Sequence, residues 1–167
     1  IDTSADELNL SLDATRVRLK ASEVEDMRRL GRAGKLGHVR RLTLAGQGLG
    51  KKAVALLRDM PELHSLDLSD NGLGAVEALA LAESLSRFDT LRDVRLGGNE
   101  FSAESMRAIV QALAKHTELE RLDVSRTGLG TDGVRSIVDE LPVSLQWLAL
   151  NENAIGSAGL KLLCTRG

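Results

Sequence analysis

Residue types that commonly perform catalysis or bind metals are scarce in this chain. The three histidines, His38, His64 and His116, stand at unrelated intervals, and none has the further ligands nearby that a zinc site would require. Glycine-containing stretches such as residues 97–99 lack the Lys-Ser/Thr ending of a phosphate-binding loop, so a nucleotide site is not expected. The sequence therefore predicts no catalytic residue, no metal site and no cofactor.

Charged side chains instead recur at a fixed interval. Asp67, Arg95 and Asp123 are separated by 28 residues each (95−67 and 123−95), and Asp93 and Arg121 keep the same separation (121−93). If the intervening residues form equivalent units, these side chains lie in rows on neighbouring strands, about 4.8 Å apart. Such rows predict either a charge ladder that neutralises itself or a mixed-charge surface that selects a partner.

An aromatic residue stands in the same rows. Trp147 is the only tryptophan in a chain with no tyrosine and two phenylalanines. It is expected to be an exposed interface anchor beside Asn151, although it could also cover the C-terminal flank or pack on Arg121. The residues predicted to bind a protein partner are Arg41, Asp67, Asp93, Arg95, Arg121, Asp123, Trp147 and Asn151. A basic corner beside Arg41 predicts either a solvated face or a site for an acidic segment, and it consists of Arg16, Arg18 and Arg40.

Five repeats position these rows. The frame L-x-x-L-x-L-x-x-N-x-L starts at Val39, Leu63, Leu91, Leu119 and Leu145. Its fourth position is always apolar, as Leu42, Leu66, Val94, Leu122 and Leu148. Its sixth position is also always apolar, as Leu44, Leu68, Leu96, Val124 and Leu150. Self-similarity at such a period indicates a solenoid, in which each unit buries its apolar face against its neighbours.

Each repeat predicts one strand followed by one helix. Positions four and six alternate with positions three and five, as in a strand, so the charged rows point away from the core. The helical spacing i, i+3, i+4 and i+7 follows, and in the third repeat it is carried by Met106, Ile109, Val110 and Leu113. In the last repeat Leu160, Leu163 and Cys164 occupy these columns. Cys164 is therefore expected in the core rather than as a nucleophile.

The ninth position of the frame is polar. A structural ladder is predicted at Asn71, Asn99 and Asn153, because an inward amide can donate to and accept from backbone groups of stacked turns. The first repeat has Gln47 and the fourth has Thr127, so the ladder should be less regular there.

Units of this length with a strand and a helix resemble the ribonuclease-inhibitor-like class of leucine-rich repeats. That class includes ribonuclease inhibitor, Ran GTPase-activating proteins, tropomodulin-type proteins and NOD-like receptors, and the resemblance covers Val39 to Cys164. It implies an α/β fold: a right-handed solenoid or horseshoe with a concave parallel sheet and convex helices. The partner-binding rows would then lie on the concave face.

The repeats divide the chain into a cap and five units. Residues 1–38 predict an N-terminal cap, with a hairpin of alternating leucines and a helix starting at Ser22, whose S-x-x-E sequence with Glu25 predicts a capping box. The units cover residues 39–62, 63–90, 91–118, 119–144 and 145–167. No polar capping unit follows the last repeat, so its flank should be apolar and could support self-association. The sequence is expected to be a fragment of a longer chain.

Composition favours an intracellular protein-binding module. A single cysteine and the absence of cysteine-rich caps favour a reducing compartment, so a cytoplasmic location is expected. The net charge of −2, with 28% charged residues, argues against a nucleic-acid partner, and no long apolar run indicates a membrane span.

The predicted function is therefore a non-catalytic scaffold or regulatory adaptor that binds another protein, or a segment of its own parent chain, on the concave sheet. Two alternatives follow from the family resemblance. One is a GTPase-activating protein of the leucine-rich repeat type, and the other is an autoregulatory sensor domain of a larger protein.

Overall fold

The computed structural model describes residues 21–37 and 39–165. Five strands, each three residues long, lie side by side in one parallel sheet in the order β1-β2-β3-β4-β5. They are β1 (Arg41–Thr43), β2 (Ser65–Asp67), β3 (Asp93–Arg95), β4 (Arg121–Asp123) and β5 (Trp147–Ala149). Each strand occupies positions three to five of its repeat, so sequence order and spatial order coincide.

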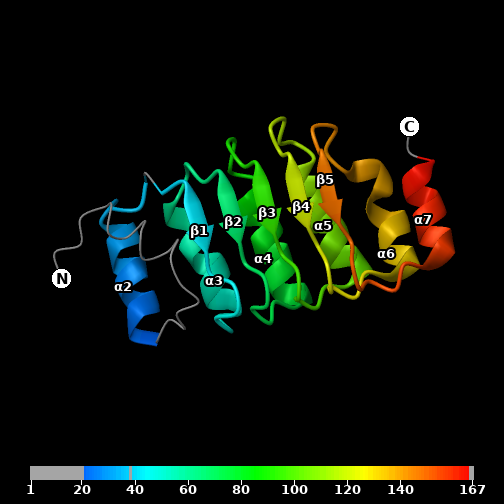
Figure 1. Cartoon of the computed structure of the whole chain (residues 1–167). Helices are drawn as coiled ribbons and strands as arrows, with labels where there is room; N and C mark the ends of the chain where they lie inside the picture. The colour runs from blue at the N-terminus through cyan, green and yellow to red at the C-terminus, as the bar shows by residue number, and fades with distance from the viewer. Residues whose placement is uncertain (1–20, 38, 166–167) are drawn as a thin grey trace.

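A helical segment follows every strand and packs behind the sheet (Figure 1). These segments are α3 (Lys51–Leu56) with the 3-10 turn η1 (Leu57–Asp59), α4 (Ala75–Leu85), α5 (Ala103–Leu113), α6 (Gly130–Ile137) with the 3-10 turn η2 (Val138–Glu140), and α7 (Gly156–Cys164). The first helix is short, as its repeat predicts. The stack of strand-and-helix units confirms the predicted α/β solenoid.

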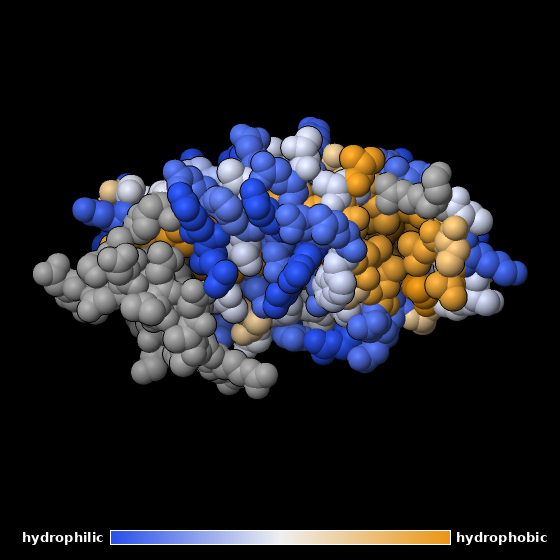
Figure 2. Space-filling view, turned by 45° about the horizontal axis from the view of Figure 1, so that its top comes forward, coloured by the Kyte–Doolittle hydropathy of each residue, from blue (hydrophilic) through white to orange (hydrophobic). Residues whose placement is uncertain are grey.

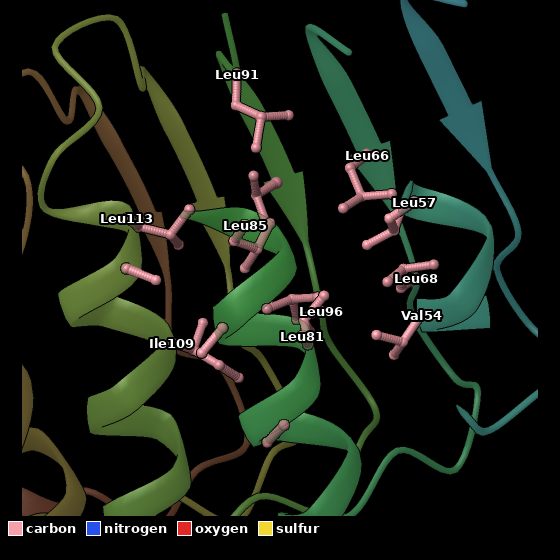
Figure 3. Close-up of a cluster of buried hydrophobic side chains, with 14 of the residues drawn as sticks. Val54, Leu57, Leu66, Leu68, Leu81, Leu85, Leu91, Leu96, Ile109 and Leu113 are labelled. Atoms are coloured by element: carbon pink, nitrogen blue, oxygen red, sulfur yellow. The ribbon is translucent and has the colours of Figure 1, made fainter. Parts of the chain in front are cut away.

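The apolar columns form one continuous core between sheet and helices (Figure 3). In the three inner repeats, positions four and six are fully buried: Leu66, Val94 and Leu122, and Leu68, Leu96 and Val124. Helix residues at the predicted spacing close this core from the other side, among them Leu81, Leu85, Ile109 and Leu113. Each helix is thus held by burial of one apolar stripe rather than by its intrinsic propensity.

The N-terminal helix predicted for the cap is present as α2 (Ala21–Arg32). It packs against α3 and η1, and Val24 and Met27 are buried. The helix begins at Ala21, one residue before the predicted start, and the Ser22 side chain needed for the predicted capping box lies outside the described part of the chain. The carboxylate of Glu25 accepts hydrogen bonds from Arg28 and Arg32 at 3.3 and 2.7 Å. The predicted hairpin lies outside the described residues.

The last repeat is less buried than the inner ones. Leu148, Leu150 and Ile155 are only partly buried, and apolar residues gather at this end of the molecule (Figure 2). This agrees with the apolar flank predicted there. Two core predictions for α7 are wrong: Leu160 is 55% exposed and Cys164 is exposed. Among the described residues α7 packs on α6, and no further helix covers its other side.

His116 links successive repeats from the end of α5. It is 5% exposed, its Nε2 lies 3.0 Å from the Leu85 carbonyl oxygen, and its Nδ1 has no hydrogen-bond partner among the described residues. Burial lowers the pKa of His116 from the ordinary value of 6.5, because the imidazolium would lose its hydration. Burial thus favours the neutral form of His116, which links the end of α5 to the end of α4.

Acid should destabilise the fold through His116. Because the folded pKa lies below the unfolded one, the unfolded chain binds a proton first, and stability is lost as pH falls below 6.5. We expect the urea midpoint of unfolding to decrease from about pH 7.5 to about pH 5.5, and to decrease less in His116→Gln. His64→Gln is the control, since His64 is more exposed. An equal pH dependence of the wild type and His116→Gln would contradict this assignment.

Candidate functional site

Two rows of side chains cross the face of the sheet that is not covered by helices. Backbone pairing places Asp67 opposite Arg95 and Arg95 opposite Asp123. It likewise places Asp93 opposite Arg121 and Arg121 opposite Trp147. We call the surface formed by these two rows the sheet surface; from β1 to β5 its residues are Arg41, Thr43, Ser65, Asp67, Asp93, Arg95, Arg121, Asp123, Trp147 and Ala149.

Arg95 occupies the centre of the sheet surface. Its guanidinium donates to both carboxylate oxygens of Asp93 in the same strand, with Nε–Oδ1 and Nη2–Oδ2 distances of 3.2 and 2.9 Å. The pKa of Arg95 is raised, first by this hydrogen bond and then by the charges of Asp93, Asp67 and Asp123, against the opposing effect of partial burial. Three carboxylates around one guanidinium leave an excess of negative charge at the centre.

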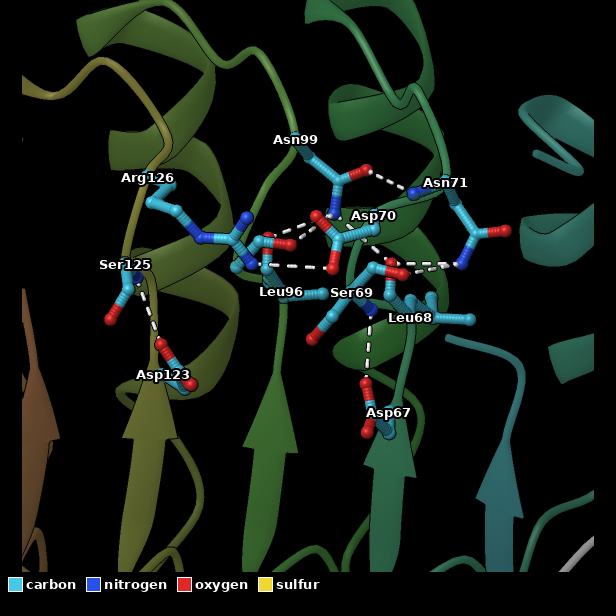
Figure 4. A network of polar contacts seen from close by, with 11 residues as sticks. Asp67, Leu68, Ser69, Asp70, Asn71, Leu96, Asn99, Asp123, Ser125 and Arg126 are labelled. Carbon is cyan, nitrogen blue, oxygen red and sulfur yellow. Dashed lines mark hydrogen bonds and ion pairs between the residues drawn. The ribbon is translucent and has the colours of Figure 1, made fainter. Parts of the chain in front are cut away.

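The flanking carboxylates are fixed by the backbone. Asp67 accepts a hydrogen bond from the Ser69 N–H at 3.0 Å, and Asp123 accepts one from the Ser125 N–H at 2.9 Å. Figure 4 shows both contacts at the ends of their strands. An aspartate that bonds the amide two residues on stabilises the turn and holds its own carboxylate in place. Both groups are thus oriented before any partner arrives.

The other end of the sheet surface is basic and aromatic. Arg121 is exposed and makes no ion pair among the described residues. Its neighbour in register, Trp147, is 49% exposed. Asn151, predicted beside Trp147, lies in the turn after β5 and is also exposed. These residues offer a cation, an apolar ring and an amide at one end of the sheet.

A second polar contact borders the sheet surface and was missed by sequence reasoning. Asp70 and Arg126 occupy equivalent turns two repeats apart, and Arg126 Nη2 lies 3.2 Å from Asp70 Oδ2 (Figure 4). The pair reaches across Gly98, where a Cβ would overlap the Asp70 carboxylate and where φ is +69°. The signal in the sequence was opposite charges on either side of a glycine at the same repeat position.

Buried asparagines hold the turns beneath this surface. The Asn99 amide donates to the carbonyl oxygens of Leu96 at 2.8 Å and Leu68 at 3.0 Å, and its Oδ1 accepts from the N–H groups of Asn71 and Leu73. Asn71 and Asn153 make corresponding bonds to the repeats before them. The three amides therefore join the second, third and fifth turns to the turns before them.

The ladder is less regular at the fourth repeat. The Thr127 hydroxyl is too short to reach the preceding repeat, and it lies 2.8 Å from the Val124 carbonyl oxygen of its own turn. The fourth and fifth turns keep the regular contact, in which the Asn153 Oδ1 accepts from the Thr127 N–H at 2.9 Å. In the first repeat Gln47 bonds its neighbour Ala45 in the same turn, at 3.3 Å.

The basic corner is only partly described. Arg16 and Arg18 lie outside the described residues. Arg40 is exposed, and its Nε lies 4.0 Å from the Glu62 carboxylate, which weakens its role as a receptor for an acidic segment. Arg41 is exposed on β1.

Neither a metal centre nor a membrane-spanning helix occurs in the described part of the chain. No group of three or more His, Cys, Asp and Glu side chains suited to a metal ion is found among residues 21–37 and 39–165. Over the same residues, no helix is both long enough and apolar enough to span a membrane.

Known proteins share both sequence pattern and fold with this chain. A family model described as Leucine Rich repeat matches residues 61–82 and 115–138. Protein CARMIL of Dictyostelium discoideum is 28% identical over 115 residues, which are 66% of this chain and 11% of that protein. NACHT, LRR and PYD domains-containing protein 5 of Homo sapiens is 28% identical over 135 residues, which are 76% of this chain and 11% of that protein. The chain thus spans 11% of the length of these relatives.

Solved structures extend the likeness to nearly the whole chain. The structure of Leiomodin-1 Actin-Binding Site 2 has a TM-score of 0.68 at 15% identity, covering 89% of this chain and 90% of that one. The tropomodulin C-terminal domain of Caenorhabditis elegans has a TM-score of 0.68 at 12% identity, covering 86% and 90%. Together with the five stacked units and their buried asparagines, these matches show that the chain contains leucine-rich repeats at the matched residues and has the fold of leucine-rich repeat domains, with a helix after each strand.

Proposed function

We propose that this chain is a non-catalytic protein-interaction module, a scaffold or regulatory adaptor whose sheet surface binds a second protein or another segment of its own polypeptide. The proposal rests on one observation: the carboxylates of Asp67 and Asp123 are held in place by backbone N–H groups and make no ion pair with Arg95 on the strand between them. A self-neutralising ladder would pair charges between strands. Among Asp67, Asp93, Arg95, Arg121 and Asp123, the ion pair between side chains joins Arg95 and Asp93 within one strand.

The arrangement favours a partner whose surface carries both positive and negative side chains beside an apolar one. Asp67 and Asp123, held by backbone N–H groups, would receive lysine or arginine side chains, whereas Arg121 would receive a carboxylate. Trp147 would supply the apolar contact that commonly dominates binding energy, with the charges setting orientation and association rate. Because the strands fix the backbone and N–H groups already hold the carboxylates of Asp67 and Asp123, these two side chains lose little conformational entropy on binding.

Actin is the first partner to test. The leiomodin-1 domain that shares the fold of this chain is named as an actin-binding site. At 15% identity the likeness supports the fold and not the binding residues, so actin is a candidate for direct measurement.

The test is a comparison of wild type with an Asp67→Asn, Arg95→Gln, Trp147→Ala variant. Asparagine at residue 67 still offers an oxygen to the Ser69 N–H, so the turn should be retained. We expect co-sedimentation with actin filaments, or retention of a partner from lysate, to weaken by about thirtyfold or more, since one interface anchor contributes about 2 kcal/mol. Circular dichroism checks that the variant is folded.

The matched control is Arg92→Gln, Glu118→Gln. It removes an exposed ion pair with a 2.7 Å contact that lies outside the two rows, and binding should remain as in the wild type. Binding that survives the triple variant unchanged would overturn the sheet surface as the binding site.

A further inference from the structure

The outward side of α4 departs from the other helices of the solenoid. Two places on each helical segment face away from the core: the third and the sixth residue after the last position of the repeat frame. In the other segments both places carry charged residues or alanine. They are Lys52 and Ala55, Glu104 and Arg107, Asp132 and Arg135, and Ala158 and Lys161. In α4 the same two places carry Val76, which is 78% exposed, and Leu79, which is 58% exposed. Burial in the core does not explain either residue.

The neighbouring helical segment, α3 with η1, carries three exposed cations. Lys51, Lys52 and Arg58 are exposed, and Lys51 and Arg58 are seven residues apart, which places them on one side of the helical segment. None of the three has an ion pair among the described residues. By contrast, Arg107 pairs with Glu140 at 3.3 Å and Arg135 with Asp132 at 2.7 Å on the later helices. The positive charge of α3 is therefore available to a partner.

A groove joins these two features. It lies between the end of α3 and the end of α4 and is lined by Leu57, Arg58, Pro61, Ser84, Arg87 and Phe88. Val76, Ala80 and Ser84 are four residues apart, so they form one line along α4 that leads into the groove. The two helices pack side by side behind the sheet (Figure 1). A line of small and apolar residues that ends at Ser84 thus runs beside a basic one over about two helical turns, or about 12 Å.

We propose that α3 and α4 form a second docking surface, which binds an acidic amphipathic helix of another protein. The apolar face of that helix would lie on Val76 and Leu79 and enter the groove, and its carboxylates would face Lys51, Lys52 and Arg58. A helix fits because its side chains at i, i+3, i+4 and i+7 present such a paired stripe to a groove. This surface is on the opposite side of the solenoid from the sheet surface and acts independently of it.

A membrane surface is a poorer occupant. A flat anionic bilayer would also meet the carboxylates that α5 and α6 expose, Glu104 and Asp132, and the chain carries a net charge of −2. The groove receives a narrow ligand, whereas a bilayer presents a broad plane.

The test selects a ligand without assuming its sequence. The library contains random displayed peptides of about 16 residues, long enough for a helix of about 24 Å. Peptides that bind the Val76→Gln, Leu79→Gln double variant are removed first, and the remaining peptides are selected for binding to the wild type. Both side chains are exposed, so the double variant should fold as the wild type does. We expect recovered peptides to carry net negative charge and apolar residues at helical spacing. A synthetic copy should bind at least about tenfold more weakly to the double variant and to Lys51→Glu, Lys52→Glu.

Two controls separate this surface from others. Arg135→Gln changes the place on α6 that corresponds to Leu79, and the sheet-surface triple variant changes the opposite face; both should bind the peptide as the wild type does. Recovery of no peptide, recovery of peptides without net negative charge, or equal binding by the Val76 and Leu79 variant would overturn the proposal. Binding of phosphatidylcholine and phosphatidylserine vesicles through Val76 and Leu79, without peptide binding, would also overturn it.

Discussion

Replacing Asn99 by alanine is expected to lower the free energy of unfolding by about 3 kcal/mol or more. Asn99 is fully buried. Its side chain accepts hydrogen bonds from the N–H groups of Asn71 and Leu73 and donates one to the carbonyl oxygen of Leu96. Alanine leaves these three backbone groups without the side chain that bonds them. Each buried group left unpaired costs about 1–3 kcal/mol, whereas the carbonyl of Leu68 keeps a donor in Asn71.

The measurement is urea unfolding followed by circular dichroism. Asn151→Ala is the control for the same substitution at an exposed place, because Asn151 lies in the turn after β5, so its loss should change stability by about 0.5 kcal/mol or less. If Asn99→Ala cost no more than Asn151→Ala, the buried amides would not be what joins the turns.

The strands and inner helices could be predicted because one physical requirement determines them. Leu96 must be apolar because this strand position faces the core, and Ile109 must follow at helical spacing because one stripe of its helix closes the same core. Repetition then removes the ambiguity that a single short strand would leave. The predicted register of Asp67, Arg95 and Asp123 depended only on this repetition.

Burial at the last helix could not be predicted in the same way. Cys164 and Leu160 occupy apolar columns, but a column specifies only which side of the helix is apolar. Whether such a side chain is buried depends on what packs on it, and that contact comes from another unit. The sequence pattern of one repeat therefore predicts the orientation of a residue better than its exposure.

Which residues form the sheet surface could be predicted more readily than the contacts between their side chains. The repeat spacing predicted which residues lie next to Arg95 on the neighbouring strands. Its ion pair with Asp93 in the same strand depends on side-chain rotamers and on the hydrogen bonds that already hold Asp67 and Asp123. The pair of Asp70 with Arg126 joins residues 56 apart and requires a glycine between them. Neither contact follows from apolar periodicity.

The exposed apolar residues on the helices do not follow from the core periodicity either. Val76 and Leu79 do not belong to the core stripe of α4, and a helix that is apolar beyond one stripe needs a second surface to cover it. Comparison of equivalent places between repeats would have singled them out. The sequence carried this signal, since the corresponding places elsewhere are charged or alanine.

Leu96→Ala should be much more costly than Leu150→Ala, although both residues occupy position six of the frame. Leu96 is fully buried between two repeats, so truncation removes burial on all sides and leaves a cavity, at a cost of about 2–5 kcal/mol. Leu150 is only partly buried on the apolar flank of the last repeat, so alanine there should cost about 1 kcal/mol. The urea midpoints of the two variants, measured at low protein concentration, give the comparison.

The size of the Leu150 effect also tests whether a second copy of the chain covers that flank. A covered flank would bury Leu150 as fully as Leu96, so the two substitutions would then cost nearly the same. Stability would also rise with protein concentration, because dimerisation stabilises the folded state by mass action. Sedimentation velocity of wild type and Leu150→Ala over the same concentrations distinguishes the cases. A single species with a small Leu150 effect would rule out self-association through this surface, whereas a dimer lost on substitution would establish it.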